Sequence, residues 1–319
     1  MGQPHRQTTT LHEGAALRES LWQRLFRGAR RLRQRPEWVR FAGPDWADRI
    51  MAVAVTDSFH AKQGRSTGRW VLETGDGRLA VYLKRHHRLP WWRGVLAAVW
   101  PDAGWSPAVQ EWQHLQWARA AGVPVPGPVA AGEYIGPWGR LQSFLAVEEL
   151  VDMVPLHQAV PAAATSLDPQ AFARWKRGLV AELARLTRVL HDRRCFHKDL
   201  YLCHVFVPRE DTDGVPPWRG RVHLIDLHRL GHHPWTWRLW QAKDLAQLLY
   251  SSEVSGLSPR DRVRFWRLYM GAERRGRAAG RLRRFVLLKW QRYRRHNLKK
   301  RQAARQATLV AAPESQPDV

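Results

Sequence analysis

Apolar residues recur every three or four positions along several stretches of the chain, the spacing that places them on one face of a helix. The longest of these stretches covers residues 170–194. Its apolar positions are Phe172, Trp175, Leu179, Leu183, Leu186 and Leu190. The same spacing predicts helices over residues 19–35, 108–121 and 240–251, and two more over residues 260–305.

Short apolar runs bounded by turn residues predict strands, and most of them lie in the first half of the chain. These runs are residues 51–55, 70–73, 79–84, 141–147 and 205–207. Gly75 and Gly77 separate the second run from the third, and glycine accepts the positive φ that a tight hairpin turn needs. The order of the elements predicts an α+β fold class, with a β-rich part followed by a helical part.

Positive charge is concentrated near the two ends of the chain, which carries a formal net charge of +24. Residues 271–305 contain fourteen Lys or Arg and one acid, and residues 18–40 contain eight Arg and two acids. Such surfaces attract phosphate groups of lipids, glycolipids or nucleic acids. The helix predicted over residues 19–35 is basic and amphipathic, and two interpretations stay open: it packs on the body of the protein, or it lies on an anionic membrane.

Residues 85–107 are rich in tryptophan, with Trp91, Trp92, Trp100 and Trp105 among basic residues. An exposed aromatic and basic loop would suit a lipid or sugar surface, because tryptophan favours the membrane–water interface. A packed element of the fold is the other interpretation, and the sequence leaves both open.

Several classes of protein are excluded by composition. Cys195 and Cys203 are the two cysteines, too few for a disulfide framework or a four-cysteine zinc site. We interpret both as small buried residues in a reducing, cytosolic setting. The first residues lack the apolar core of a signal peptide, and no apolar run is long enough to span a bilayer. No nucleic-acid-binding motif is recognisable, so no nucleic-acid partner is expected.

The candidate chemistry centres on two aspartates. Asp199 lies in the run His197-Lys198-Asp199 before a predicted strand, and Asp226 follows a second apolar run. Kinase-like folds place such a pair in one active site, where the first Asp takes a hydroxyl proton and the second holds Mg²⁺ on ATP. The rest of the chain must then supply a lysine and its partner in the right order.

Lys84 and Glu111 fit that order. Lys84 ends the strand that follows the glycine-containing hairpin, which is the setting of the kinase lysine that pairs with ATP phosphates. Glu111 lies on the next predicted helix and is a plausible partner for the lysine ammonium. The set predicts a two-lobed, protein-kinase-like fold with ATP and Mg²⁺ as cofactors.

Three weaker assignments complete the predicted site. Residues 61–69 contain Gly64 and Gly68 and are the candidate loop over the phosphates, although they lack a full glycine-rich motif. Glu148 and Glu149 follow a predicted strand, where a hinge between lobes would offer backbone groups to adenine. Asp244 is expected to support the catalytic loop by hydrogen bonds.

The motifs resemble those of the lipopolysaccharide kinase (Kdo/WaaP) family. The residues that carry the likeness are His197–His204, Ile225–Arg229 and Lys243–Leu248. The resemblance covers roughly residues 50–250. It implies transfer of the ATP γ-phosphoryl group to a heptose or Kdo sugar of the lipopolysaccharide inner core. The implied partners are a core or lipid A precursor as substrate and the anionic cytoplasmic face of the inner membrane, on which the protein would be peripheral.

Two positions depart from ordinary protein kinases. His204 stands five residues after Asp199, where those kinases have an Asn that binds the second Mg²⁺. Imidazole is a poor ligand for a hard cation, so His204 binds a second metal weakly or contacts phosphate or water instead. Tyr82 replaces the small residue over adenine and implies a differently shaped nucleotide pocket.

Other functions remain open at this point. The same fold could phosphorylate another small molecule or a protein hydroxyl, and a non-catalytic basic binding protein would also explain the charge. We expect residues 1–40 to form a basic tail and amphipathic helix and residues 41–150 a kinase-like N-lobe. Residues 151–305 should form a C-lobe ending in a basic helix, and residues 306–319 a disordered tail.

Overall fold

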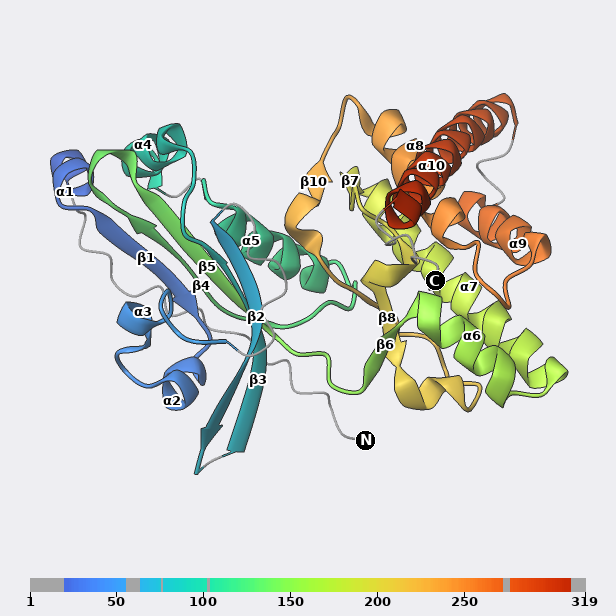
Figure 1. The fold of residues 1–319 in the computed structure, drawn as a ribbon, viewed down its shortest axis with the longest axis horizontal. Helices are drawn as coiled ribbons and strands as arrows, with labels where there is room; N and C mark the ends of the chain where they lie inside the picture. Colours follow the sequence, from blue (N-terminus) through green and yellow to red (C-terminus); the bar gives the residue numbers. More distant parts are fainter. Residues whose placement is uncertain (1–19, 56–63, 76, 102–103, 272–275, 311–319) are drawn as a thin grey trace, which may run out of the picture. The chain divides into compact units, whose positions relative to one another are not determined.

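The computed structural model describes residues 20–55, 64–75, 77–101, 104–271 and 276–310, with side chains described up to residue 298 (Figure 1). The chain forms two compact units. Unit 1 comprises Met1–Val151 and Leu224–Arg229, and unit 2 comprises Asp152–His223 and Leu230–Val319. The short segment Leu224–Arg229 therefore belongs with the first half of the chain, although it follows much of unit 2 in sequence.

Unit 1 is built on a five-stranded sheet in the order β1-β4-β5-β3-β2. Its strands are β1 (Ala29–Gln34), β2 (Arg65–Thr74), β3 (Gly77–His86), β4 (Pro128–Ile135) and β5 (Leu141–Glu148). All neighbouring strands are antiparallel. Its helices are α1 (Leu21–Phe26), α2 (Trp38–Ala42), α3 (Trp46–Arg49), α4 (Trp91–Val99), α5 (Pro107–Ala120), and the 3₁₀ turns η2 (Pro137–Gly139) and η5 (Leu227–Arg229).

The predicted hairpin is confirmed as β2 and β3, in register from Arg65 opposite His86 to Thr74 opposite Gly77. Side chains alternate along β3. Val81 and Leu83 pack with Trp38 of α2 in the core of unit 1, so Lys84 faces the other side of the sheet. That side is where α5 supplies Glu111.

The helix predicted over residues 19–35 is wrong beyond Phe26. Gly28 adopts a φ of +85°, which ends the helical course. The next residues form β1, whose Ala29 is buried and pairs with Ile135 of β4. Edge-strand pairing thus overrides the helical spacing, and the arginines of β1 extend along the sheet.

Residues 51–55 do not form the predicted strand. The buried guanidinium of Arg85 instead binds this segment, donating hydrogen bonds to the carbonyl oxygens of Ile50, Met51 and Val53 at 3.3, 3.2 and 2.7 Å. These bonds hold the segment in an irregular course, without strand pairing.

Unit 2 is mainly helical, as predicted. Its helices are α6 (Leu156–Ser166), α7 (Pro169–Asp192), α8 (Trp237–Ser251), α9 (Pro259–Met270) and α10 (Arg277–Val310). Its smaller elements are β6 (Met153–Pro155), β7 (Cys195–Phe196), η3 (Leu202–His204), β8 (Val205–Pro208), η4 (Arg209–Thr212) and β10 (Gly231–His232), with β9 (His223–Leu224) at the boundary with unit 1. The strands pair as β6-β8-β9 and β10-β7. Helix α10 continues to Val310, so the expected boundary at residue 305 was five residues short; residues 311–319 lie outside the described part.

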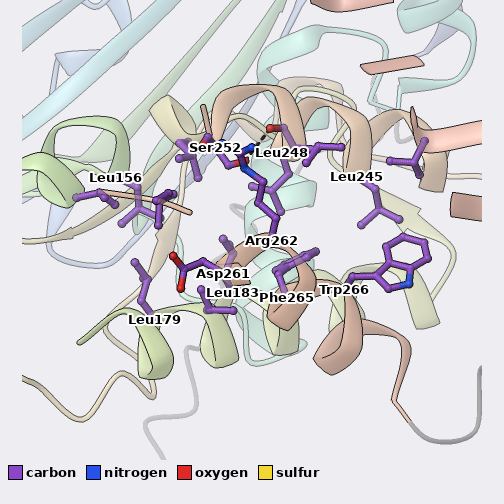
Figure 2. A pocket seen from close by; sticks show the side chains of 16 residues that line it. Leu156, Leu179, Leu183, Leu245, Leu248, Ser252, Asp261, Arg262, Phe265 and Trp266 are labelled. Carbon is purple, nitrogen blue, oxygen red and sulfur yellow. Dashed lines mark hydrogen bonds between the residues drawn. The ribbon is translucent and has the colours of Figure 1, made fainter. Parts of the chain in front are cut away.

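An apolar hollow of about 100 Å³ lies within unit 2 (Figure 2). Leucines of α6, α7 and α8 line it, and α9 adds Phe265 and Trp266. Asp261 and Arg262 are the charged residues at its wall. Among the helices that the structure describes, none is both long and apolar enough to cross a bilayer.

Candidate active site

Lys84 is held by two carboxylates within unit 1. Its ammonium lies 2.6 Å from Oε1 of Glu111 on α5 and 3.4 Å from Oδ1 of Asp226, two residues beyond β9. The Lys84 side chain is 13% exposed and that of Glu111 is 4% exposed. Three predicted site residues that lie far apart in sequence are therefore brought together in one unit.

The two carboxylates decide the charge of the lysine. Burial lowers the pKa of Lys84, but the negative charges of Glu111 and Asp226, with the Glu111 hydrogen bond, outweigh it, and the net shift is upward. The ammonium is therefore protonated at neutral pH. A fixed cation on a strand is suited to pairing with phosphate oxygens.

Asp226 lies at a sharp turn of the backbone. Its φ is +61°, in the left-handed region that few L-residues adopt and that Asp, Asn and His tolerate better than the others. His228 donates from Nδ1 to Asp226 Oδ1 at 2.7 Å, and His114 of α5 donates from Nδ1 to the carbonyl of Leu227 at 2.9 Å. These two imidazoles fix the turn that presents the Asp226 carboxylate, and the sequence motif alone assigned neither of them that role.

His86 lies two residues beyond Lys84 on β3 and is buried. Burial, together with the positive charges of Arg65 and Lys84, lowers the pKa of His86 to about 4. The unfolded chain would bind a proton at His86 below about pH 6.5, whereas the folded chain would bind it near pH 4. Acidification between these values therefore favours the unfolded state.

We expect His86 to contribute a loss of about 3 kcal/mol in the free energy of unfolding as the pH falls from 6.5 to 4. The His86→Gln variant lacks this titration, so its stability should decline less over that range. Urea unfolding of both proteins at several pH values measures the difference. Parallel stability curves for the two proteins would contradict the assignment.

The loop that carries Asp199 is suspended from α8 in unit 2. The buried Asp244 carboxylate accepts the backbone N–H groups of His197 and Lys198, both at 2.8 Å. Nε2 of His191 donates to the same carboxylate at 3.3 Å, and Nδ1 of His191 accepts a hydrogen bond from the Tyr269 hydroxyl at 2.8 Å. The prediction that Asp244 supports the loop is confirmed by these bonds.

Gln247 and Lys243 also hold this loop, a role that no local sequence pattern predicted for either residue. The Gln247 amide accepts the N–H of Leu200 at 3.2 Å and donates to the carbonyl of Lys198 at 3.1 Å. It also reaches Oδ1 of Asp199 at 3.5 Å, and Lys243 donates to the Lys198 carbonyl at 2.5 Å. Lys198 has a φ of +66°, so these contacts hold a strained backbone directly before Asp199.

His204 contacts the backbone of the same loop. Its Nδ1 lies 2.8 Å from the carbonyl oxygen of Asp199. A carbonyl can only accept, so Nδ1 carries the proton and Nε2 keeps its lone pair when the ring is neutral. The assignment of His204 to metal or nucleotide binding stays a prediction.

The predicted phosphate loop is partly wrong. Residues 65–69 belong to β2, and Gly68 pairs with Leu83 of β3. Gly64 precedes the strand with a φ of +75°, and its carbonyl accepts the N–H of His87. Lys62 lies outside the described residues. Nucleotide contacts of Gly64 and Gly68 stay predictions.

Glu148 and Glu149 at the end of β5 already have partners. The N–H of Glu148 donates to Gly127 and that of Glu149 to Ala80, at 2.8 and 2.9 Å. Arg35 binds the Glu148 carboxylate at 2.5 Å, and Arg69 binds both oxygens of Glu149 at 2.8 Å. Both residues thus stabilise unit 1, and their contact with adenine stays a prediction.

The two cysteines differ in exposure. Cys195 is buried, and burial raises the pKa of its thiol. Cys203 is exposed, which corrects the expectation that both are buried. Cys203 lies within η3, whose Leu202 turns inward instead.

The residues present fit a magnesium ion. Mg²⁺ prefers oxygen ligands and is usually bound by one or two carboxylates together with substrate phosphates. Among the described residues no group of three or more His, Cys, Asp or Glu forms a complete metal site. The Asp226 carboxylate beside the phosphate-binding candidate Lys84 is the donor that such a shared site requires.

Comparison with known proteins agrees with this geometry. The family model for the lipopolysaccharide kinase (Kdo/WaaP) family matches residues 56–269. The lipopolysaccharide core heptose(I) kinase WaaP of Pseudomonas aeruginosa is 34% identical over 206 residues, which are 63% of this chain and 74% of that protein. The protein of the same name from Escherichia coli K12 is 32% identical over 170 residues, 51% of this chain and 60% of that one.

A solved structure of WaaP in complex with acyl carrier protein is also similar. It has a TM-score of 0.62 and 29% sequence identity, over 82% of this chain and 98% of that one. The predicted protein-kinase-like fold is thereby confirmed. Because the family model covers more than half of the sequence, this chain belongs to the lipopolysaccharide kinase (Kdo/WaaP) family.

Proposed function

We propose that this protein transfers the γ-phosphoryl group of ATP to a heptose hydroxyl in the inner core of lipopolysaccharide. The observation that carries the proposal is the Lys84 ammonium between the carboxylates of Glu111 and Asp226, in a chain whose relatives are named heptose(I) kinases. A non-catalytic basic protein would have no use for a buried lysine held in this way.

Asp199 is the proposed catalytic base. Its carboxylate would orient the acceptor hydroxyl and take its proton as the oxygen attacks the γ-phosphorus. Proton transfer by a positioned side chain depends on a fixed geometry, which Asp244 and Gln247 supply through their bonds to the loop backbone.

Lys84 is the proposed ligand of the α- and β-phosphates, and Glu111 fixes its position. Asp226 would hold Mg²⁺, which when bound neutralises phosphate charge. Phosphoryl transfer is catalysed mainly by such positioning and charge neutralisation. The buried setting of Lys84 strengthens its attraction for phosphate, because little water competes there.

The place of action follows from the acceptor. Lipopolysaccharide precursors carry lipid chains, so we propose that the protein works at the anionic cytoplasmic face of the inner membrane, as a peripheral protein. The relative of known structure is in complex with an acyl carrier protein. We include a protein of that kind among the proposed partners of this chain.

The test uses γ-labelled ATP, Mg²⁺ and two purified acceptors: lipid A with an inner core that contains heptose, and lipid A that carries only Kdo. We expect label on the first acceptor alone. Label on the Kdo-only acceptor would overturn the choice of heptose, and label on neither would overturn the proposed function.

A further inference from the structure

One edge of unit 1 exposes a group of large aromatic side chains, which we name the tryptophan face. Its members are Trp22 and Phe26 of α1, Trp91 and Trp92 of α4, and Trp138 of η2. Trp138 is 74% exposed, Trp91 70% and Trp22 67%. Indole rings usually bury most of their apolar area, so a cluster of exposed ones indicates an interaction site.

The aromatic rings of α1 and η2 touch one another. Trp22 stacks on Phe26 with ring centres 5.5 Å apart, and Phe26 meets the edge of Trp138 at 4.9 Å. Figure 1 shows α1 and α4 beside each other at the same end of the sheet of unit 1. The Arg24 guanidinium joins these helices by donating to the carbonyl of Ala98 at 2.6 Å.

Two glycines allow the turn η2 to pack closely against α4. A Cβ on Gly94 would overlap the carbonyl of Gly139, and a Cβ on Gly139 would lie 2.7 Å from the carbonyl of Trp91. Backbone therefore packs directly on backbone. Trp138 has a φ of +58°, an unfavourable conformation for a bulky residue, yet its ring is left in solvent. The backbone of Trp138 is therefore strained although most of its indole ring stays exposed, and strained positions of this kind gather at functional sites.

Helix α4 is apolar on both sides. Gly94, Ala97 and Ala98 form its buried face, while Trp91 and Trp92 lie outside. Arg93 is its one charged residue, and the guanidinium lies over the Trp92 ring at 5.2 Å. A surface helix of a water-soluble domain normally carries a polar outer face, whereas a helix in the interface of a bilayer carries an apolar one.

The positive charge around the tryptophan face indicates an anionic partner. Residues 20–28, 88–101 and 136–142 contain four arginines besides Arg93 and no acidic residue. They are Arg24, Arg27, Arg88 and Arg140, with Arg30 and Arg31 following directly in β1. Arg27 and Arg140 are exposed beside Phe26 and Trp138. Indole rings and arginines together match the interface of an anionic bilayer, where the rings lie at headgroup level and the guanidinium groups meet lipid phosphates.

We infer that the tryptophan face docks unit 1 on the anionic membrane that holds the acceptor, with its indole rings inserted at headgroup depth. The inference rests on the proposed function for the identity of that membrane. It assigns the apolar part of membrane binding to this face and not to the basic helix α10.

The experiment measures flotation of the full chain with vesicles of phosphatidylethanolamine and phosphatidylglycerol, and quenching of its tryptophan fluorescence by brominated lipids. The test variant is Trp22→Ser, Trp91→Ser and Trp138→Ser combined. The matched control is Trp235→Ser, since Trp235 of unit 2 is 93% exposed and outside this face. We expect the triple variant to lose about tenfold or more in vesicle affinity and most of the quenching, and the control to behave as wild type.

A second pair of variants tests the charges. Arg27→Gln with Arg140→Gln should weaken vesicle binding about fivefold per arginine, and Arg283→Gln with Arg284→Gln on the exposed side of α10 should weaken it less. Thermal unfolding of each variant checks that it folds. No ATP or acceptor is present, so failure of docking and failure of the kinase assay are distinguishable.

Three results would overturn the inference. The first is that the wild-type chain does not bind the vesicles. The second is that the triple variant binds them and is quenched as strongly as wild type. The third is that the Arg283 and Arg284 double variant loses binding while the Arg27 and Arg140 double variant keeps it. Self-association of the wild-type chain through this face, without vesicle binding, would assign the face to a second copy instead.

Discussion

The Asp199→Asn variant is expected to transfer phosphate to the heptose acceptor about 100- to 10,000-fold more slowly than wild type. Asparagine keeps the shape of the side chain and can still meet the acceptor hydroxyl, but it cannot take its proton. The loss should therefore fall on kcat, with little change in the KM for ATP. Initial rates with γ-labelled ATP measure both constants.

The control for this variant is the stability of unit 2. Asp199 is partly exposed, and the bonds that suspend its loop come from Asp244 and Gln247 to backbone groups. Urea unfolding of Asp199→Asn should match wild type within about 1 kcal/mol. A loss of several kcal/mol in the free energy of unfolding, together with the loss of activity, would mean that Asp199 is structural. Full activity of the variant would show that Asp199 is not the catalytic base.

The Lys84→Met variant is expected to lose about 100- to 1,000-fold in kcat/KM, the effect of removing one group that neutralises charge in a transition state. It should also be less stable by roughly 3–5 kcal/mol, because Glu111 would remain as a buried carboxylate without its cation. Steady-state kinetics and urea unfolding measure the two effects separately.

The double variant Lys84→Met with Glu111→Gln separates the two effects. The neutral amide no longer needs a cation, so stability should recover in large part. Activity should not recover, because the phosphate-binding charge is still missing. Recovery of activity in the double variant would contradict the role assigned to Lys84.

The site could be predicted from sequence where a motif fixes both residue type and local geometry. The strand that carries Lys84 is predicted from alternation and from Gly75 and Gly77, and its pairing with Glu111 from the order of the elements. The support of the loop by Asp244 was predictable for the same reason. Each of these depends on a short motif, or on the order in which such motifs follow one another.

Other features depend on contacts that no local pattern encodes. The strand β1 follows a helical spacing, yet Gly28 and pairing with β4 decide its conformation. The segment near Met51 is irregular because the Arg85 guanidinium, more than thirty residues away in sequence, binds its carbonyl groups. Gln247 reaches Asp199 from another element, so its role is visible only in the folded chain.

The tryptophan face also depends on contacts that no local sequence pattern encodes. The sequence indicated an aromatic and basic stretch in residues 85–107 but left open whether it packs or is exposed. Helix α4 does both, since Ala97 and Ala98 are buried while Trp91 and Trp92 are not. Trp22 and Trp138 lie next to α4 only because of tertiary contacts, and these cannot be predicted from one stretch of sequence.

The central claim is that this protein phosphorylates an inner-core heptose with ATP, using Asp199. The most direct measurement incubates wild type and Asp199→Asn with Mg²⁺, ATP and a heptose-containing acceptor, and then locates the new phosphate by mass spectrometry of the isolated core. We predict one added phosphate on a heptose with wild type and almost none with the variant in the same time. Phosphate on another group, or equal phosphorylation by both proteins, would contradict the account.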